Sequence, residues 1–157
     1  MIDRLKRLLE HRHDLRPADH DTLQLAAAAL MIEVALMDGH LDDRERQTIL
    51  DIVRIQFGLA PSEAEGLFEA AAANRGGASD LWTFASVVKA RFSEEERIRL
   101  VEMLWRVAYA DGVLHDYEAH LLRRIAGLIY VSDHERGAAR QRVLAALALA
   151  KSATDGQ

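Results

Sequence analysis

The sequence predicts an all-α fold, and three observations support this: its residue types, the spacing of its apolar residues and its repeated helix-start signals. Alanine, leucine, glutamate and arginine dominate, and all four favour helices. Only 2 prolines occur among 157 residues. Apolar residues recur at helical intervals, as in Leu121, Leu122, Ile125, Leu128 and Ile129. A chain of this length can bury one sizeable core, so we expect a single compact helical domain.

Helix starts carry a capping-box signature, in which Ser or Asp precedes Glu by three residues. The pairs are Asp42–Glu45, Ser62–Glu65, Ser93–Glu96 and Ser132–Glu135. Pro61, beside one of these caps, presets a first-turn dihedral angle. The signals predict about 7–8 helices, near residues 2–13, 19–37, 43–57, 62–74, 79–91, 94–110, 116–130 and 133–150.

Each expected helix has a local justification. The first has an apolar side formed by Ile2, Leu5, Leu8 and Leu9, and the second contains a weakly polar run over 23–37. The third, fourth, sixth and eighth follow the four caps, and the loop at 74–77 separates the fourth from the fifth. The seventh follows a second acidic bend, and the tail over 152–157 is expected to fray.

A frame of the form V-A-x-x-D-G-x-L-x-D-x-E occurs twice, at residues 34–45 and 107–118. With an offset of 73, eight identities fall within 19 positions. The identical pairs are Val34/Val107, Ala35/Ala108, Asp38/Asp111, Gly39/Gly112, Leu41/Leu114, Asp43/Asp116, Glu45/Glu118 and Ile52/Ile125. We therefore expect an internal three-helix duplication, with units at about 19–74 and 94–150 that pack on each other. The predicted organisation is an N-terminal amphipathic helix over 1–16, a helical domain over 17–151 and a tail over 152–157.

Composition excludes several classes of function. The chain has no cysteine, which excludes disulfides, thiolate metal sites and thiol redox chemistry. The net charge of −5 argues against binding to nucleic-acid backbones. No G-x-S-x-G, phosphate-loop or G-x-G-x-x-G motif occurs, so we expect no catalytic and no cofactor-binding residues. No apolar run reaches the ~20 residues that a membrane-spanning helix needs, and we expect a cytoplasmic protein.

Each repeated frame holds an acidic bend between two helices. Glycine suits the left-handed end of a helix, and Leu41 and Leu114 are expected to turn inward. Asp38 and Asp111 would face the negative end of a helix dipole, at a cost of about 0.3–1 kcal/mol. Three compensations are open: hydrogen bonds from nearby backbone amides, an ion pair, or a divalent cation. The candidate ion-pair partners are Arg44, Arg106 and Arg123.

The candidate metal ligands are Asp38 and Glu45 in the first bend, and Asp111 and Glu118 in the second. Carboxylate oxygens suit calcium, magnesium or manganese, although calcium takes 6–8 oxygen ligands and each bend offers fewer. The EF-hand spacing does not fit, because Ile49 stands where its last ligand would be. A Glu10–His13 pair and an Asp116–His120 pair are incomplete as transition-metal motifs.

The N-terminal helix predicted over 2–13 is basic and amphipathic. Such a helix can lie on an anionic membrane surface, or it can dock on its own domain or on a partner protein. Deletion of residues 1–16 separates these alternatives through its effect on vesicle binding or on thermal stability.

The repeated bends, with LWRVAYADGV at 104–113 and EAHLLRRIAGLIYVSD at 118–133, closely resemble the tellurite-resistance protein B (TerB-like) family, in its stand-alone branch. The resemblance covers roughly residues 24–145. It implies an all-helical fold with internal duplication. It also implies that Asp38, Glu45, Asp111 and Glu118 bind metal or line an interaction surface. The first copy departs from the pattern at Leu36-Met37, and the second has His115 opposite Asp42.

We expect a non-enzymatic protein-interaction module, because family members resemble components of stress-related or membrane-associated assemblies. The alternative is a divalent-metal-binding protein that uses the acidic bends. A protein partner is expected, whereas a nucleic-acid partner is not.

Overall fold

The computed structural model describes residues 16–38, 41–73, 78–110, 112 and 114–155, and within these ranges every regular element is a helix. The elements are α2 (Arg16–Ala35), the 3₁₀ turn η1 (Leu36–Asp38), α3 (Asp43–Phe57), α4 (Pro61–Ala73), α5 (Ala78–Arg91), α6 (Glu94–Ala108), α7 (Asp116–Leu128) and α8 (Asp133–Asp155). The all-α prediction is confirmed. The helix predicted over 2–13 lies outside the described residues.

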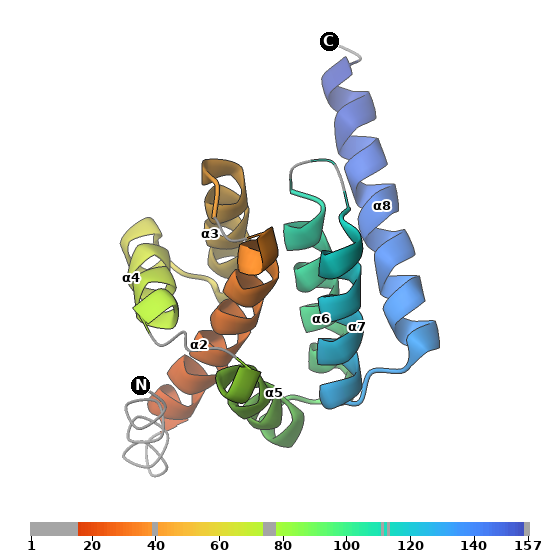
Figure 1. Ribbon diagram of the computed structural model, residues 1–157. Helices are drawn as coiled ribbons and strands as arrows, with labels where there is room; N and C mark the ends of the chain where they lie inside the picture. Colours follow the sequence, from red (N-terminus) through yellow and green to blue (C-terminus); the bar gives the residue numbers. More distant parts are fainter. Residues whose placement is uncertain (1–15, 39–40, 74–77, 111, 113, 156–157) are drawn as a thin grey trace.

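Helix α2 occupies the centre of the bundle and packs against α3, α4, α5, α6 and α7 (Figure 1). Every residue from Leu25 to Ile32 is at most 7% exposed. A helix that is apolar on all sides is stable only when other elements surround it. The four consecutive alanines, Ala26–Ala29, let neighbouring helices approach it closely.

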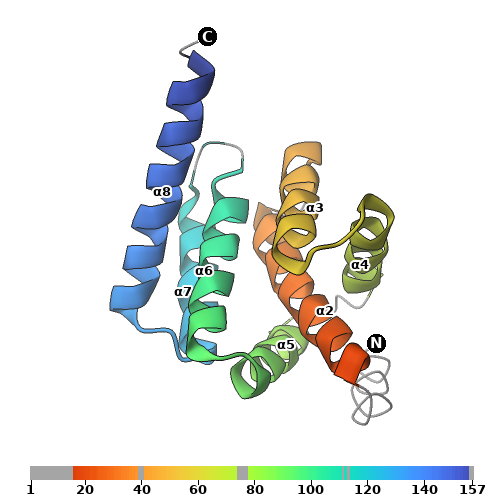
Figure 2. The same cartoon turned by 180° about the vertical axis from the view of Figure 1, so that it is seen from behind.

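Helices α6, α7 and α8 form the other side of the bundle, with α6 packed against both α2 and α8 (Figure 2). The inner side of α6 is formed by Leu100, Leu104 and Val107, each at most 1% exposed. Ala139 and Val143 of α8 are the residues of that helix that enter the core. The second half of α8 extends beyond the body of the bundle.

Most predicted boundaries agree with the structure within two residues, and one predicted helix start differs in its cap. The boxes at Asp42–Glu45 and Ser93–Glu96 are confirmed, and Ser132 Oγ accepts a hydrogen bond from the Glu135 amide at 3.1 Å. The Ser62–Glu65 box is wrong. Helix α4 begins one residue earlier, at Pro61, and the Ala60 amide donates to Glu63 at 2.9 Å.

Two further differences concern Glu65 and the end of the chain. Glu65 does not cap α4 but forms an ion pair with Arg46, with their side-chain atoms 2.6 Å apart. This hydrogen-bonded pair raises the pKa of Arg46. Helix α8 continues to Asp155, so the helix end predicted near 150 is too early. The run from 143 to 150 contains only alanine, leucine and valine, and Lys151 continues the helix because nothing in this stretch stops it.

Helices α2 and α6 end, and α3 and α7 begin, at the same end of the bundle (Figures 1 and 2). Gly112 has φ +85°, the left-handed conformation expected of it. Leu41 and Leu114 are half-buried and pack against the core, also as expected. Gly39 lies outside the described residues.

The order of the helices is compatible with the expected duplication. Helix α2 packs against α3 and α4, and α6 packs correspondingly against α7 and α8. The superposition of the two units stays a prediction. In the described part of the chain, no helix combines the length and the apolar character that crossing a membrane requires.

The alanine tract of α2 yields a first prediction. Ala28 is completely buried, so Ala28→Leu would force three extra carbon atoms against neighbouring helices. We expect a loss of about 1–3 kcal/mol in the free energy of unfolding, measured by urea denaturation. Ala145→Leu, at an exposed position of α8, should change it by less than about 0.5 kcal/mol. Equal losses for both variants would contradict the central placement of α2.

The corner between α7 and α8 places a tyrosine in an unusual backbone conformation. Tyr130 has φ 61°, and it is the residue after Ile129, the C-terminal cap of α7. The Val131 amide donates to the Ala126 carbonyl at 2.8 Å, which closes the helix end in the manner usually served by glycine. The exposed ring contacts Lys89, whose ammonium group donates to the Tyr130 hydroxyl at 2.9 Å and lowers its pKa.

Substitution of Tyr130 tests this strain. The left-handed conformation costs a residue with a Cβ roughly 1–2 kcal/mol of stability. Glycine avoids this cost, but its greater freedom in the unfolded chain lowers stability by about 0.5–1 kcal/mol. Tyr130→Gly should therefore be more stable to urea than Tyr130→Ala by about 0.5–1 kcal/mol. Both variants lose the Lys89 contact, so the comparison isolates the backbone. A more stable alanine variant would show that the conformation is not strained.

Candidate functional site

Glu45, one of the predicted metal ligands, is a buried capping residue of α3. The residue is only 7% exposed. Its backbone amide donates to Asp42 Oδ1 at 2.7 Å, while its own Oε1 accepts from the Asp42 amide at 3.4 Å. This reciprocal arrangement satisfies two free amides at the start of the helix.

Glu118 holds the corresponding position in α7. It is 6% exposed, and its Oε1 accepts from the His115 amide at 3.3 Å. The His115 ring stacks on Tyr117, with centroids 5.2 Å apart and the ring planes inclined by 2°. The structure thus gives Glu45 and Glu118 the same local role. Because both carboxylates are buried, an exposed interaction surface at the bends would have to use other residues.

The remaining two predicted ligands cannot be placed in the same way. Asp38 ends η1, but its side chain lies outside the described part of the structure, as does the whole of Asp111. Among the described residues, no three His, Asp or Glu side chains gather as a metal site would require. A site that combines all four predicted ligands stays a prediction.

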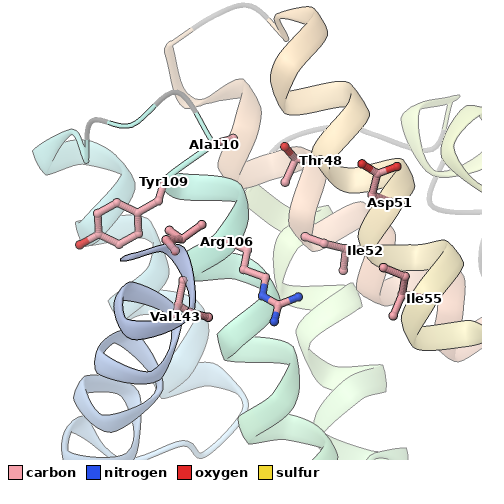
Figure 3. A pocket seen from close by; sticks show the side chains of 10 residues that line it. Thr48, Asp51, Ile52, Ile55, Arg106, Tyr109, Ala110 and Val143 are labelled. Atoms are coloured by element: carbon pink, nitrogen blue, oxygen red, sulfur yellow. The ribbon is translucent and has the colours of Figure 1, made fainter. Parts of the chain in front are cut away.

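A groove opens between α3 and α8, with the C-terminal end of α6 as its floor (Figure 3). Its volume is about 380 Å³. We call it the α3–α8 groove, and define it by its lining residues: Thr48, Asp51, Ile52, Ile55, Arg106, Tyr109, Ala110, Val143, Ala146 and Leu147.

The groove combines buried apolar residues at the base of its two walls with exposed apolar rims. Ile52 and Val143 are 5% and 3% exposed, so they belong to both the core and the groove. Ile55 on the α3 rim is 76% exposed, and Leu147 on the α8 rim is 42% exposed. Burial of an exposed Leu or Ile side chain contributes about 1.5–3 kcal/mol, so both rims favour an apolar occupant.

Aromatic and polar contacts on the other side of α6 fix the position of α8. Trp105 Nε1 donates to the Arg136 carbonyl at 3.1 Å, and Arg140 Nε donates to the Tyr109 hydroxyl at 2.7 Å. The Arg140 guanidinium also lies 5.7 Å from the centre of the Trp105 ring. A further ion pair joins Arg142 to Glu102. These contacts hold one wall of the groove at a defined distance from the other.

The charges along the groove are of both signs. Asp51 lies on the α3 wall, where Gln47 donates to its carboxylate at 2.8 Å. Arg106 is exposed on α6, and its guanidinium forms no ion pair with any residue that the structure describes. Ala110, at the end of the floor, directly precedes the second acidic bend.

Sequence reasoning missed this groove. The sequence-based prediction placed a helix at 133–150 without assigning its sides, and residues 145–150 are all exposed in the structure. A signal was present, because the run from 143 to 150 has no polar residue and is too continuous for one side of an amphipathic helix. Ile55 carried no comparable signal, since it stands in the same apolar run as Ile49, Ile52 and Val53, which are buried.

Comparison with known proteins supplies the family. A sequence profile for tellurite resistance protein TerB matches residues 24–141, which run from the start of the buried part of α2 into α8. The profile ends before Val143, so the α8 wall of the groove lies beyond the matched residues. Searches of curated proteins and of solved structures found no match. Because the match covers most of the chain, this protein belongs to the TerB family of tellurite resistance proteins.

Proposed function

We propose that this chain is a non-enzymatic protein-interaction module, and that it serves a stress-related or membrane-associated assembly. The observation that carries the proposal is the α3–α8 groove, whose apolar rims are exposed at Ile55 and Leu147. Exposed apolar surface of this kind is characteristic of protein-binding sites. The occupant is an amphipathic segment of a partner protein, which places apolar side chains between α3 and α8.

The surroundings of the groove suggest the charge of this segment. The chain carries a net charge of −5, and the groove residue Ala110 directly precedes Asp111 in the sequence. A segment with basic residues beside its apolar ones would complement this surface, and charge complementarity raises association rates more than it raises affinity. Arg106 would face an acidic or polar residue of the same segment.

Photo-crosslinking in cells tests the proposal. With p-benzoylphenylalanine at Ile55 or at Leu147, we expect both positions to capture the same partner, because they lie on opposite rims of one groove. Leu149 is the control, since it is 72% exposed on the same helix and does not line the groove.

The captured partner allows a quantitative check. Ile55→Asp should weaken its binding about tenfold or more in isothermal titration, because a buried unpaired charge would replace an apolar contact. Equal capture from Leu149, or capture of only a second copy of this chain, would contradict the proposal.

A divalent-cation site at the acidic bends is the second candidate. Its support is that Glu45 and Glu118 occupy matching positions at the same end of the bundle, each directly after a bend that contains another aspartate. Calcium, magnesium and manganese prefer carboxylate oxygens as ligands.

Thermal denaturation with millimolar calcium, magnesium or manganese tests this candidate. A bound cation should raise the Tm by mass action, and a concentration of 100 times the Kd would add about 2.7 kcal/mol to stability. Asp38→Asn combined with Asp111→Asn should abolish the rise, whereas Asp51→Asn should preserve it. Absence of heat in isothermal titration at millimolar metal would exclude the site.

A further inference from the structure

Helices α5 and α7 contribute a surface whose charge is opposite to that of the chain as a whole. The segments 81–92 and 119–132 contain Lys89, Arg91, Arg123 and Arg124 but no Asp or Glu. The whole chain carries a net charge of −5, so acidic residues are concentrated elsewhere. Both helices face the viewer in Figure 1, and they pack against each other.

The exposed sides of these two helices meet at the corner between α7 and α8. Lys89 Nζ donates to the Tyr130 hydroxyl at 2.9 Å and lies 4.1 Å from the centre of the Tyr130 ring. Trp82 precedes Lys89 by about two helical turns, and it therefore lies on the same side of α5. Arg123 and Arg124 are exposed on α7. We call the surface formed by Trp82, Lys89, Arg123, Arg124 and Tyr130 the α5–α7 face.

The arginine charges of this face are not neutralised within the described part of the chain. Arg123 and Arg124 form no ion pair with any residue that the structure describes. Arg46, Arg136 and Arg142, by contrast, each pair with a carboxylate. A cluster of cations without nearby carboxylates creates a positive potential that attracts an anionic partner.

The two aromatic side chains of the face project from it rather than line a hollow. Trp82 is 62% exposed and Tyr130 is 67% exposed, and neither lines the α3–α8 groove. Tryptophan and tyrosine combine an apolar ring with one polar group, so they are favoured at the boundary between lipid headgroups and acyl chains. A soft headgroup layer accepts projecting rings, whereas an acidic protein segment binds best where side chains form a hollow for it.

We propose that the α5–α7 face docks on an anionic lipid surface. Trp82 and Tyr130 enter the headgroup layer, while Lys89, Arg123 and Arg124 lie against the negative headgroups. Docking of this kind is reversible, because it relies on a few charges and rings at the surface of the bilayer. None of these residues lines the α3–α8 groove, so the inference goes beyond the function proposed for the groove and does not depend on it.

Sedimentation of the full chain with lipid vesicles tests the proposal. We expect binding to vesicles that contain phosphatidylserine and phosphatidylcholine, no binding to phosphatidylcholine alone, and weaker binding as salt screens the charges. Tryptophan fluorescence gives a second readout. Of the two tryptophans, Trp105 is 4% exposed and already shielded from water, so a shift to shorter wavelength on binding would report on Trp82.

Charge-matched variants locate the contact. Arg123→Gln combined with Arg124→Gln should weaken binding to the phosphatidylserine vesicles by roughly tenfold or more, since each basic side chain near an anionic surface adds to the attraction. Arg44→Gln combined with Arg54→Gln makes the same change in net charge at exposed positions of α3 and should keep the binding. An unchanged Tm in both double variants shows that they are folded.

Four outcomes would overturn the proposal. The first is no binding to phosphatidylserine vesicles at low salt, and the second is equal binding to phosphatidylcholine alone. The third is binding that survives in the Arg123→Gln and Arg124→Gln double variant, or that falls equally in the control, because another part of the chain would then make the contact. The fourth is binding of poly-L-glutamate without binding of vesicles, which would assign the face to an acidic protein.

Discussion

Burial of α2 on all its sides is the constraint on which the rest of the structure depends. Leu25–Ile32 are closed to solvent because α3, α4, α5, α6 and α7 all pack against α2. The alanines of α2 set how near those helices lie, and the larger side chains Leu30, Met31 and Ile32 fill the space beyond them. The removal of this much apolar surface from water outweighs the cost of placing Gln24 and Glu33 on the same helix.

The position of α6 follows from α2 and in turn determines the binding surface. Its inner side packs against α2, whereas Trp105 and Tyr109 face α8 and hold it through Arg136 and Arg140. Helices α3 and α8 are thereby kept apart over the end of α6, and the α3–α8 groove is the space between them. Apolar side chains that would have met in a closed bundle remain available at Ile55 and Leu147.

The sequence was informative wherever one local rule decided the outcome. Capping and turn chemistry involve only a few neighbouring residues. They account for the helix starts at Asp42 and Ser93, for the left-handed Gly112, and for the inward position of Leu41 and Leu114. The start of α4 was predicted wrongly, since Pro61 at the first helical position prevailed over the Ser62–Glu65 pattern. The groove could not be predicted, because it depends on the angles between helices and on gaps between residues distant in sequence.

The contacts that hold α8 have a further consequence for its dynamics. They all lie before residue 144, and the described side chains beyond it are exposed or half-buried. The final turns therefore rely on their own backbone hydrogen bonds, and a short helical end of this kind opens by local helix–coil fluctuation. Amide hydrogen exchange should consequently become faster along α8 towards its C-terminus. The part of the groove wall formed by Ala146 and Leu147 can thus adapt its shape to an incoming ligand, while Val143 stays in the core.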